Sequence, residues 1–240
     1  MRISYCFSDS HIAYYAASIR GLEHEKEKTE NQDSFIAKTY SKGYVFAVSD
    51  GVGSCKYSSF GSKRVCKAVA KVGKLYLKGK ITEKEIPQKI FYFYRKACVP
   101  KFVKKQMSAT CIYLIASQEK VVLGQVGDGL CFVSRGEKGK ALKMKDDDFT
   151  NIVSALNASR ENTPRFTISH LHFQNNETFS ALLCTDGISE DIKSEHYSEF
   201  LNECLKESQN NSGYLEKLLR NWPTPNSFDD KTAIIIQIKP

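Results

Sequence analysis

The sequence predicts an α+β fold in which antiparallel sheets and helices occupy separate stretches of the chain. Three observations support this: short apolar runs of strand length, amphipathic patterns of helical period in separate regions, and a last apolar run at the C-terminus. Their order is strands, two helices, a run of strands, further helices and a final strand. Because no internal repeat or linker interrupts the 240 residues, we expect residues 1–240 to form a single domain.

Strands are predicted where β-branched and aromatic residues form short apolar runs between turn residues. These runs are residues 2–7, 13–20, 35–39, 44–48, 109–116, 120–126, 129–134, 166–173, 177–184 and 232–238. We expect residues 109–134 to form a three-stranded antiparallel meander. We expect residues 166–184 to form a hairpin that turns at 174–176.

Helices are predicted where apolar residues recur every three or four positions. The first begins near Phe60 after a capping serine, Ser58 or Ser59, and ends at Gly79. The second begins at Thr82, and helical stretches follow at about 188–197, 199–208 and 212–220. The charged segment 21–30 lacks such a period, and we expect it to be a solvated loop.

The composition is that of a globular protein, with 41% hydrophobic residues and a net charge of +8. The basic residues are dispersed, so we expect no nucleic-acid partner, whereas an acidic or phosphorylated partner fits the charge. No apolar run approaches about 18 residues and the N-terminal segment does not resemble a signal peptide, so we expect no membrane partner. The eight cysteines lack CxxC pairs, as in a reduced, cytoplasmic protein.

Acidic residues recur at the ends of the predicted strands, where chance would place fewer than one Asp-Gly pair. The pairs are Asp50-Gly51, Asp128-Gly129 and Asp186-Gly187, and Asp229-Asp230 precedes the last strand. Each pair alone is typical of a turn, but four such positions indicate one shared site. Because the site offers oxygen ligands and no histidine cluster, it favours Mg²⁺ or Mn²⁺ over zinc.

Five motifs, in this order and rough spacing, resemble those of the metal-dependent protein phosphatases, the PPM or protein phosphatase 2C family. They are Asn31-Gln32-Asp33-Ser34, Ser49-Asp50-Gly51-Val52-Gly53, Gly127-Asp128-Gly129, Thr185-Asp186-Gly187 and Asp229-Asp230-Lys231-Thr232. The resemblance covers about residues 21–238 and looks closest to the short bacterial-type branch, whose opening motif resembles Gly21 and His24 here. It implies an α-β-β-α sandwich with a metal cleft at one end and a variable flap over about 136–164.

The resemblance also implies roles for individual residues around two metal ions. Asp50 would bridge both ions and the Gly51 carbonyl would add a ligand, while Asp186 and Asp229 would hold one ion. Asp33 would orient metal-bound water, and Asp128 would hold a third, weaker ion. No Cys, Ser or His nucleophile is needed, because two cations neutralise a phosphomonoester and activate a water.

Two departures from the family pattern concern the second metal and the phosphate. Gln32-Asp33 stands where the family often has Glu-Asp, although this branch often shows the same pair. The phosphate-binding Arg of the family would fall at Lys28, which binds phosphate as a point charge without the bidentate fork. His24 is expected to order the loop beside the metals on the same, phosphate-binding side. The acidic run Asp146-Asp147-Asp148 is interpreted as a solvated loop or helix cap rather than a metal site.

The leading hypothesis is therefore a Mg/Mn-dependent phosphatase for phosphoserine and phosphothreonine, with a phosphoprotein substrate and a Ser/Thr kinase or its targets as partners. Two alternatives stay open. The first is a non-catalytic module that binds phosphoproteins in the same cleft, motivated by Lys28 and Gln32. The second is a phosphatase for small phosphorylated metabolites, which would need the same acidic residues.

Overall fold

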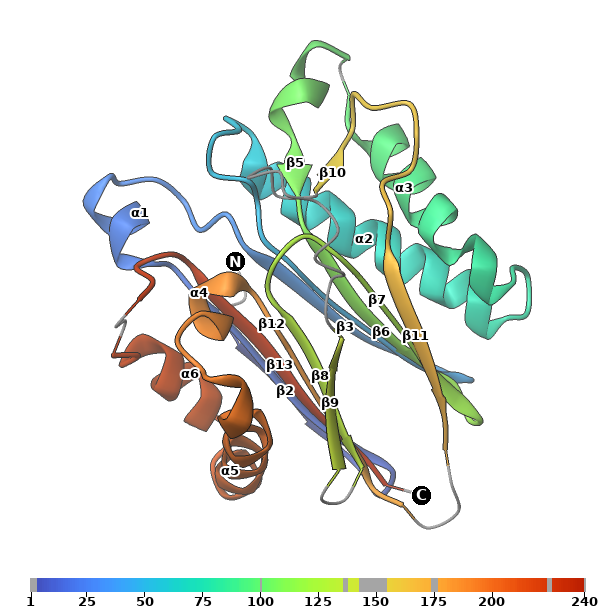
Figure 1. The fold of residues 1–240 in the computed structure, drawn as a ribbon, viewed down its shortest axis with the longest axis vertical. Coiled ribbons are helices and arrows are strands. Elements are labelled where there is room, and N and C mark those ends of the chain that lie inside the picture. The colour runs from blue at the N-terminus through green and yellow to red at the C-terminus, as the bar shows by residue number, and fades with distance from the viewer. Residues whose placement is uncertain are drawn as a thin grey trace.

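Two antiparallel sheets pack face to face, and helices cover the outer face of each (Figure 1). The computed structural model describes residues 4–99, 101–135, 138–142, 155–173, 177–223 and 226–239. The predicted α-β-β-α sandwich is confirmed. The acidic run 146–148 and the predicted turn at 174–176 lie outside the described residues, as does most of the predicted flap between 143 and 154.

The first sheet has six strands, all paired antiparallel. Its spatial order is β1 (Ser4–Ser8), β2 (Ile12–Ile19), β13 (Lys231–Ile238), β12 (Phe179–Cys184), β8 (Leu130–Arg135) and β9 (Lys138–Leu142). The C-terminal strand β13 lies in the middle, between β2 and β12. The last strand of the chain therefore joins its first strands to its second half.

The second sheet has five antiparallel strands. Its order is β11 (Thr167–His172), β7 (Lys120–Val126), β6 (Cys111–Ala116), β4 (Gly43–Ser49) and β3 (Ser34–Tyr40). A separate two-stranded ladder pairs β5 (Ser108–Ala109) with β10 (Leu156–Asn157).

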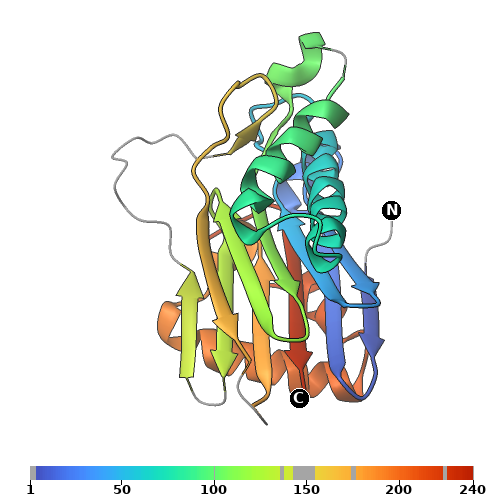
Figure 2. The same ribbon diagram turned by 90° about the vertical axis from the view of Figure 1, so that its right-hand side faces the viewer.

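Two long helices, α2 (Ser58–Leu77) and α3 (Ile86–Ala97), lie side by side on the five-stranded sheet (Figures 1 and 2). On the six-stranded sheet lie α5 (Tyr197–Asn210) and α6 (Tyr214–Arg220). The short helical elements are α1 (Leu22–Lys26), α4 (Asp186–Ser189) and the 3₁₀ turns η1 (Glu83–Glu85), η2 (Lys101–Gln106) and η3 (Ser194–His196). No helix in the described part of the chain is both long and apolar enough to span a bilayer.

Three apolar layers hold the sandwich together. The central layer between the sheets includes Phe46, Leu114 and Ile234. A second layer lies under α2 and α3, and a third lies under α5 and α6. Burial on both faces explains why the central strands are continuous apolar runs rather than alternating ones.

Two predicted strand pairings are wrong. β7 and β8 follow each other in the chain but belong to different sheets, and so do β11 and β12. Residues 109–134 are therefore not a meander, and residues 166–184 are not a hairpin. β7, β8 and β12 are buried on both faces, so their residue pattern does not distinguish pairing with the next strand from crossing to the other sheet.

The segment predicted as a solvated loop at 21–30 contains the short helix α1. The predicted serine cap of α2 is also wrong. The helix starts at Ser58, Tyr57 is its N-cap, and no side chain caps it. Gly79 does follow the end of α2 as predicted, with a positive φ of 67°. The last strand, predicted at 232–238, is confirmed as β13.

Candidate metal centre

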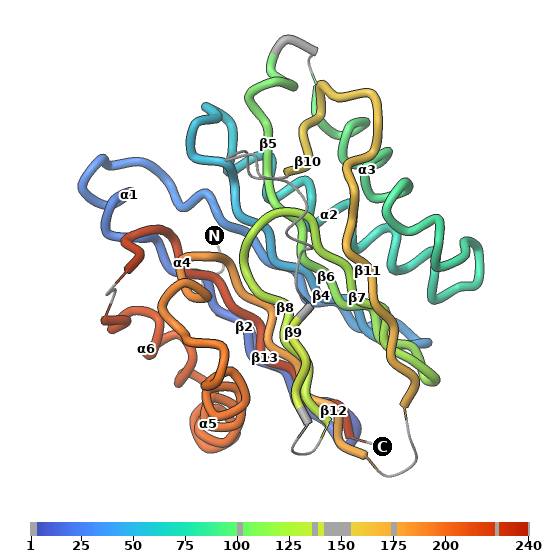
Figure 3. Tube along the Cα trace, in the orientation of Figure 1, coloured from blue at the N-terminus to red at the C-terminus, as the bar shows by residue number. Residues whose placement is uncertain are grey.

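The predicted acidic residues gather at one end of the sandwich, although they come from both sheets. Asp50 follows β4, Asp186 follows β12, and Asp229 lies two residues before β13. Asp128 lies in the turn that crosses from β7 to β8. The Cα trace shows this end beside α1 and α4, far from the C-terminal end of β13 (Figure 3).

Three of these carboxylates are close enough to share a cation. One oxygen each from Asp50, Asp128 and Asp186 lie within 4.8 Å of one another. A hard divalent ion binds oxygens at about 2.0–2.6 Å, so ligands on opposite sides of one ion are about 4–5 Å apart. The donor set, all oxygen and negatively charged, is the type that Mg²⁺ and Mn²⁺ prefer.

Asp33, a neighbour of Asp50, is almost completely buried, at 1% exposure. Its Oδ2 accepts a hydrogen bond of 2.8 Å from the Thr185 hydroxyl, while its Oδ1 is buried without a hydrogen-bond donor. Asp33 is also the charged neighbour that acts most strongly on Asp50. A buried carboxylate oxygen without a donor is costly, and a bound cation, or water held by one, would satisfy it.

The pKa values of these carboxyls are raised because protein atoms and other carboxyls crowd them, although Asp50 and Asp186 are only half-buried and Asp128 is exposed. Burial is the largest cause for Asp50, followed by repulsion from Asp33 and Asp186, and its pKa lies well above the usual range. Burial and repulsion from Asp128 and Asp229 raise the pKa of Asp186 to about 7. Partial loss of hydration among the surrounding protein atoms, with a smaller effect of Asp229, raises the pKa of Asp128. Such a cluster can ionise fully only when a cation compensates its charge.

The glycines after Asp50 and Asp186 are required by close backbone contacts. A Cβ on Gly51 would lie 2.7 Å from the backbone carbonyl of Ser58, in the first turn of α2. A Cβ on Gly187 would lie 2.1 Å from the carbonyl oxygen of Asp230. In addition to permitting a turn, each glycine therefore lets a ligand-bearing segment pack against the neighbouring chain.

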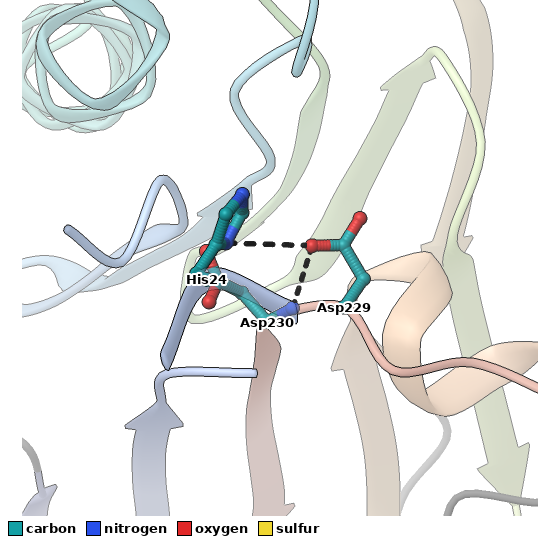
Figure 4. A group of neighbouring side chains, drawn as sticks. All are labelled: His24, Asp229 and Asp230. Atoms are coloured by element: carbon teal, nitrogen blue, oxygen red, sulfur yellow. Dashed lines mark hydrogen bonds and ion pairs between the residues drawn. The ribbon is translucent and has the colours of Figure 1, made fainter. Parts of the chain in front are cut away.

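His24, Asp229 and Asp230 form a second group (Figure 4). Asp229 is near enough to the first group to raise the pKa values of Asp50, Asp128 and Asp186. The Nδ1 atom of His24 is 2.9 Å from Asp230 and 3.7 Å from Asp229. Burial lowers the pKa of His24, but the two negative charges more than offset this and raise it overall. His24 therefore lies beside Asp229, one of the predicted metal ligands, and its role on the phosphate-binding side stays a prediction.

Asp230 binds backbone N–H groups of a distant segment, a structural role that the sequence did not indicate. Its two carboxylate oxygens accept backbone hydrogen bonds from Gly21 at 2.7 Å and from Gln32 at 2.6 Å. These two residues are the ends of the segment that contains α1. Asp230 therefore closes the segment 21–32 into a loop and positions Asp33, which follows Gln32.

Lys28 lies on the loop between Gly21 and Gln32. It follows the end of α1, is exposed, and has a left-handed backbone with φ of 57°. None of the ion pairs or side-chain hydrogen bonds among the described residues joins Lys28 to Asp33, Asp50 or Asp186. Its predicted contact with phosphate stays a prediction.

Hydroxyl groups at the start of α2 also belong to the site. Ser58 donates to the Gln32 side chain at 2.5 Å, and Ser59 donates to Glu30 at 2.5 Å. Ser62 donates to the Gln32 carbonyl, also at 2.5 Å. The clustering of serines at a helix start was the available signal, but it equally indicates a helix cap.

The comparison with known proteins agrees with this geometry. A sequence model of the family described as protein phosphatase 2C matches residues 20–222, which is most of the chain. The chain therefore belongs to the protein phosphatase 2C family. No curated protein is a significant match in a direct sequence comparison.

Several solved structures share the fold at low sequence identity. RsbX in complex with magnesium superposes with a TM-score of 0.64 at 16% identity, over 98% of this chain and all of that one. The serine/threonine phosphatase PstP of Mycobacterium tuberculosis gives 0.66 at 20% identity, over 96% of this chain and all of that one. Stp1 of Staphylococcus aureus gives 0.64 at 17% identity, over 95% of both chains.

Proposed function

We propose that this chain is a serine/threonine protein phosphatase that hydrolyses phosphoserine and phosphothreonine with two bound Mn²⁺ or Mg²⁺ ions. The observation that carries the proposal is the convergence of Asp50, Asp128 and Asp186 from both sheets. Family membership and the resemblance to structures described as serine/threonine phosphatases support it. A further solved relative is the catalytic domain of PstP in complex with two manganese ions.

Each predicted residue has a place in this proposal. Asp50 would hold both ions and the carbonyl of Gly51 would add a ligand. Asp186 and Asp229 would complete the coordination of one ion, and Asp128 would hold a third ion. When bound, the ions supply neutralisation of the phosphate charge and activation of a water.

The remaining residues would position the water and the phosphate rather than hold a metal ion. Thr185 fixes one oxygen of Asp33, so the other oxygen is free to orient a water or hold a proton. Asp230 and the serines of α2 hold the loop that ends at Asp33. His24 and Lys28, on that loop, would face the negatively charged phosphate. The physiological substrate would be a cytoplasmic protein phosphorylated by a Ser/Thr kinase, which places the chain in signal transduction.

The proposal is tested by phosphate release from a phosphothreonine peptide during a manganese titration. We expect turnover that rises with manganese and is abolished by a chelator, and we expect Asp186→Asn to lose at least about a hundredfold in kcat/KM, since it removes a metal ligand. Asp9→Asn is a matched control. It changes a carboxylate in the β1–β2 turn, at the opposite end of β13, where Asn can still accept the backbone bonds of His11 and Ile12.

Other outcomes assign the chain to a different function. Binding of the phosphopeptide without turnover at saturating manganese would identify a non-catalytic phosphoprotein-binding module. Faster turnover of small phosphorylated metabolites than of any phosphopeptide would identify a metabolite phosphatase. Full activity of Asp186→Asn would contradict the metal centre itself.

A further inference from the structure

The positive charge of the chain comes from one segment. Residues 56–105 contain 15 of the 35 Lys and Arg residues but only two of the 27 acidic ones, Glu83 and Glu85. Outside this segment, acidic residues outnumber basic ones. Because the segment folds as α2, η1, α3 and η2, the helix layer on the five-stranded sheet is strongly basic. The charge that looks dispersed along the sequence is concentrated on one face.

Within this layer, a row of lysines follows the outer face of α2. Lys67, Lys71, Lys74 and Lys78 are all exposed and are spaced by four, three and four residues, which places them on one side of the helix. We call these four residues the lysine row. At about 1.5 Å per residue, the row is about 16 Å long.

The lysine row is not neutralised by the protein. In the described part of the chain, no ion pair involves any of its four members. Lys71 lies over the ring of Phe93 at 4.0 Å, and Lys74 lies over that of Tyr40 at 5.9 Å. The 20 residues of α2 contain no acidic residue, so its basic residues repel one another, which destabilises the helix slightly.

The row leads toward the metal centre. One turn before Lys67, Lys63 pairs with Glu30 at 3.2 Å. Glu30 also accepts the hydrogen bond of Ser59, and Ser58 beside it binds Gln32. The N-terminal end of α2 is therefore tied to the loop that carries Asp33, and the lysine row extends away from that point along the protein surface.

We propose that the lysine row docks an acidic, extended segment of a phosphoprotein substrate while the phosphorylated residue lies at the metal centre. This inference rests on the proposed phosphatase function. In an extended chain, side chains on one face repeat about every 6.6–6.8 Å, close to the 6 Å rise of four helical residues. A segment of about five residues, acidic at alternate positions, matches the row in length and charge.

A protein segment fits the row better than a nucleic acid does. The row contains no arginine for bidentate contact with phosphate. The large exposed aromatic residue of α2, Phe60, precedes the row by two helical turns and is already contacted by the charged groups of Lys63 and Arg64, so no free ring lies beside the row on α2 for a base to stack on. A single row of flexible ammonium groups is suited to separate carboxylates.

The test compares two phosphothreonine peptides that carry, on either side of the phosphoresidue, alternating Glu in one and alternating Gln in the other. With the full chain and manganese, we expect the Glu peptide to have a KM about tenfold lower at low salt, with kcat similar, and the difference to shrink at high salt. The triple variant Lys67→Gln, Lys71→Gln, Lys74→Gln should remove this preference. Rates are normalised to hydrolysis of para-nitrophenyl phosphate, which is too small to reach the row.

A matched control has the same change in net charge outside the basic layer, in α5, in α6 and just before η3: Lys206→Gln, Lys217→Gln and Lys193→Gln, all exposed. It should keep the preference for the Glu peptide. Equal KM values for the two peptides, or an equal effect of both triple variants, would overturn the proposal. So would tighter, row-dependent binding of a single-stranded oligonucleotide, which would assign the row to nucleic acid.

Binding is measured separately by fluorescence anisotropy with the unphosphorylated Glu peptide. Row-dependent binding without turnover of any phosphopeptide would contradict the phosphatase function and leave the docking surface intact. Turnover of both phosphopeptides without row-dependent binding would contradict the docking surface alone.

Discussion

At the scale of single residues, the acidic cluster combines side chains that differ in what they do. Asp50, Asp128 and Asp186 present oxygens to a common point. Asp230, adjacent in sequence to a predicted ligand, instead binds the backbone of Gly21 and Gln32. Being an aspartate therefore does not tell whether a residue is a candidate metal ligand or holds the backbone in place. The atoms within hydrogen-bond distance of its carboxylate tell the two roles apart.

The two glycines that follow Asp50 provide a matched pair for testing the close packing of the metal loop. A Cβ on Gly51 would overlap the first turn of α2, whereas a Cβ on Gly53 would meet no atom within 4 Å. We expect Gly51→Ala to lower the free energy of unfolding by about 1–3 kcal/mol and to reduce phosphatase activity. Gly53→Ala should stay within about 0.5 kcal/mol of the parent.

Urea denaturation followed by circular dichroism measures the stability of both variants, and phosphate release measures their activity. If Gly51→Ala were as stable and active as Gly53→Ala, the contact between Gly51 and α2 would not be a constraint on the metal loop.

At the scale of elements, the connection between α2 and α3 is attached to the sheet by a small charged group. Glu83 of η1 binds Lys120 of β7 at 2.6 Å and His170 of β11 at 3.0 Å. Burial raises the pKa of Glu83, but these neighbours more than offset this and lower it overall. The group joins the basic helix layer to the two strands at one edge of its sheet.

Glu83→Gln should lower the free energy of unfolding at pH 7 by about 0.5 kcal/mol, a small value because the three side chains are partly exposed. A carboxylate whose pKa is lowered by folding stabilises the protein above its unfolded pKa. That stabilisation is lost as the pH falls through the lower, folded pKa. The difference between parent and variant should therefore disappear well below pH 4.5, the ordinary value for Glu.

Thermal unfolding measured from pH 3 to pH 8 follows this loss. Glu119→Gln, at an exposed position in the β6–β7 turn, is the control and should show no such pH dependence. A constant difference between Glu83→Gln and the parent at every pH would show that packing, rather than charge, is responsible.

At the scale of the whole molecule, the clustered carboxylates of the candidate metal centre repel one another, and a bound cation would reduce this repulsion. The proposed ligands come from both sheets, so ions bound there would bridge the two halves of the sandwich. Binding to the folded state alone stabilises it by about 2.7 kcal/mol at a hundred times the dissociation constant. For a chain of this size, we expect manganese to raise the unfolding temperature by about 5–10 °C.

Asp186→Asn separates the repulsion between the carboxylates from the stabilisation by bound manganese. It removes one repelling charge, so the metal-free variant should be at least as stable as the metal-free parent, but it should lose most of the shift with manganese. Differential scanning fluorimetry with and without a chelator measures both. An unchanged shift in the variant would exclude Asp186 as a ligand.

Much of this molecule follows from local patterns in its sequence. The strand ends at Asp50 and Asp186, the final strand β13 and the end of α2 at Gly79 were all predicted, because buried strands, Asp-Gly turns and helix ends each have a local chemical cause. The recurrence of Asp-Gly pairs also indicated a shared acidic site. The resemblance of the chain to the protein phosphatase 2C family rested on five motifs occurring in the family's order.

Only the tertiary structure decided which strands pair and which residues support the metal centre. β7 and β8 are buried on both faces, so nothing local shows that the chain crosses between sheets at Asp128. Ser58 could equally have capped its helix, but it binds Gln32 across the fold. By contrast, the lysine row follows from local helical spacing, and the tertiary structure decided only that this side of α2 faces solvent. In the first two cases the deciding contact joins residues far apart in the chain, and local chemistry does not encode such contacts.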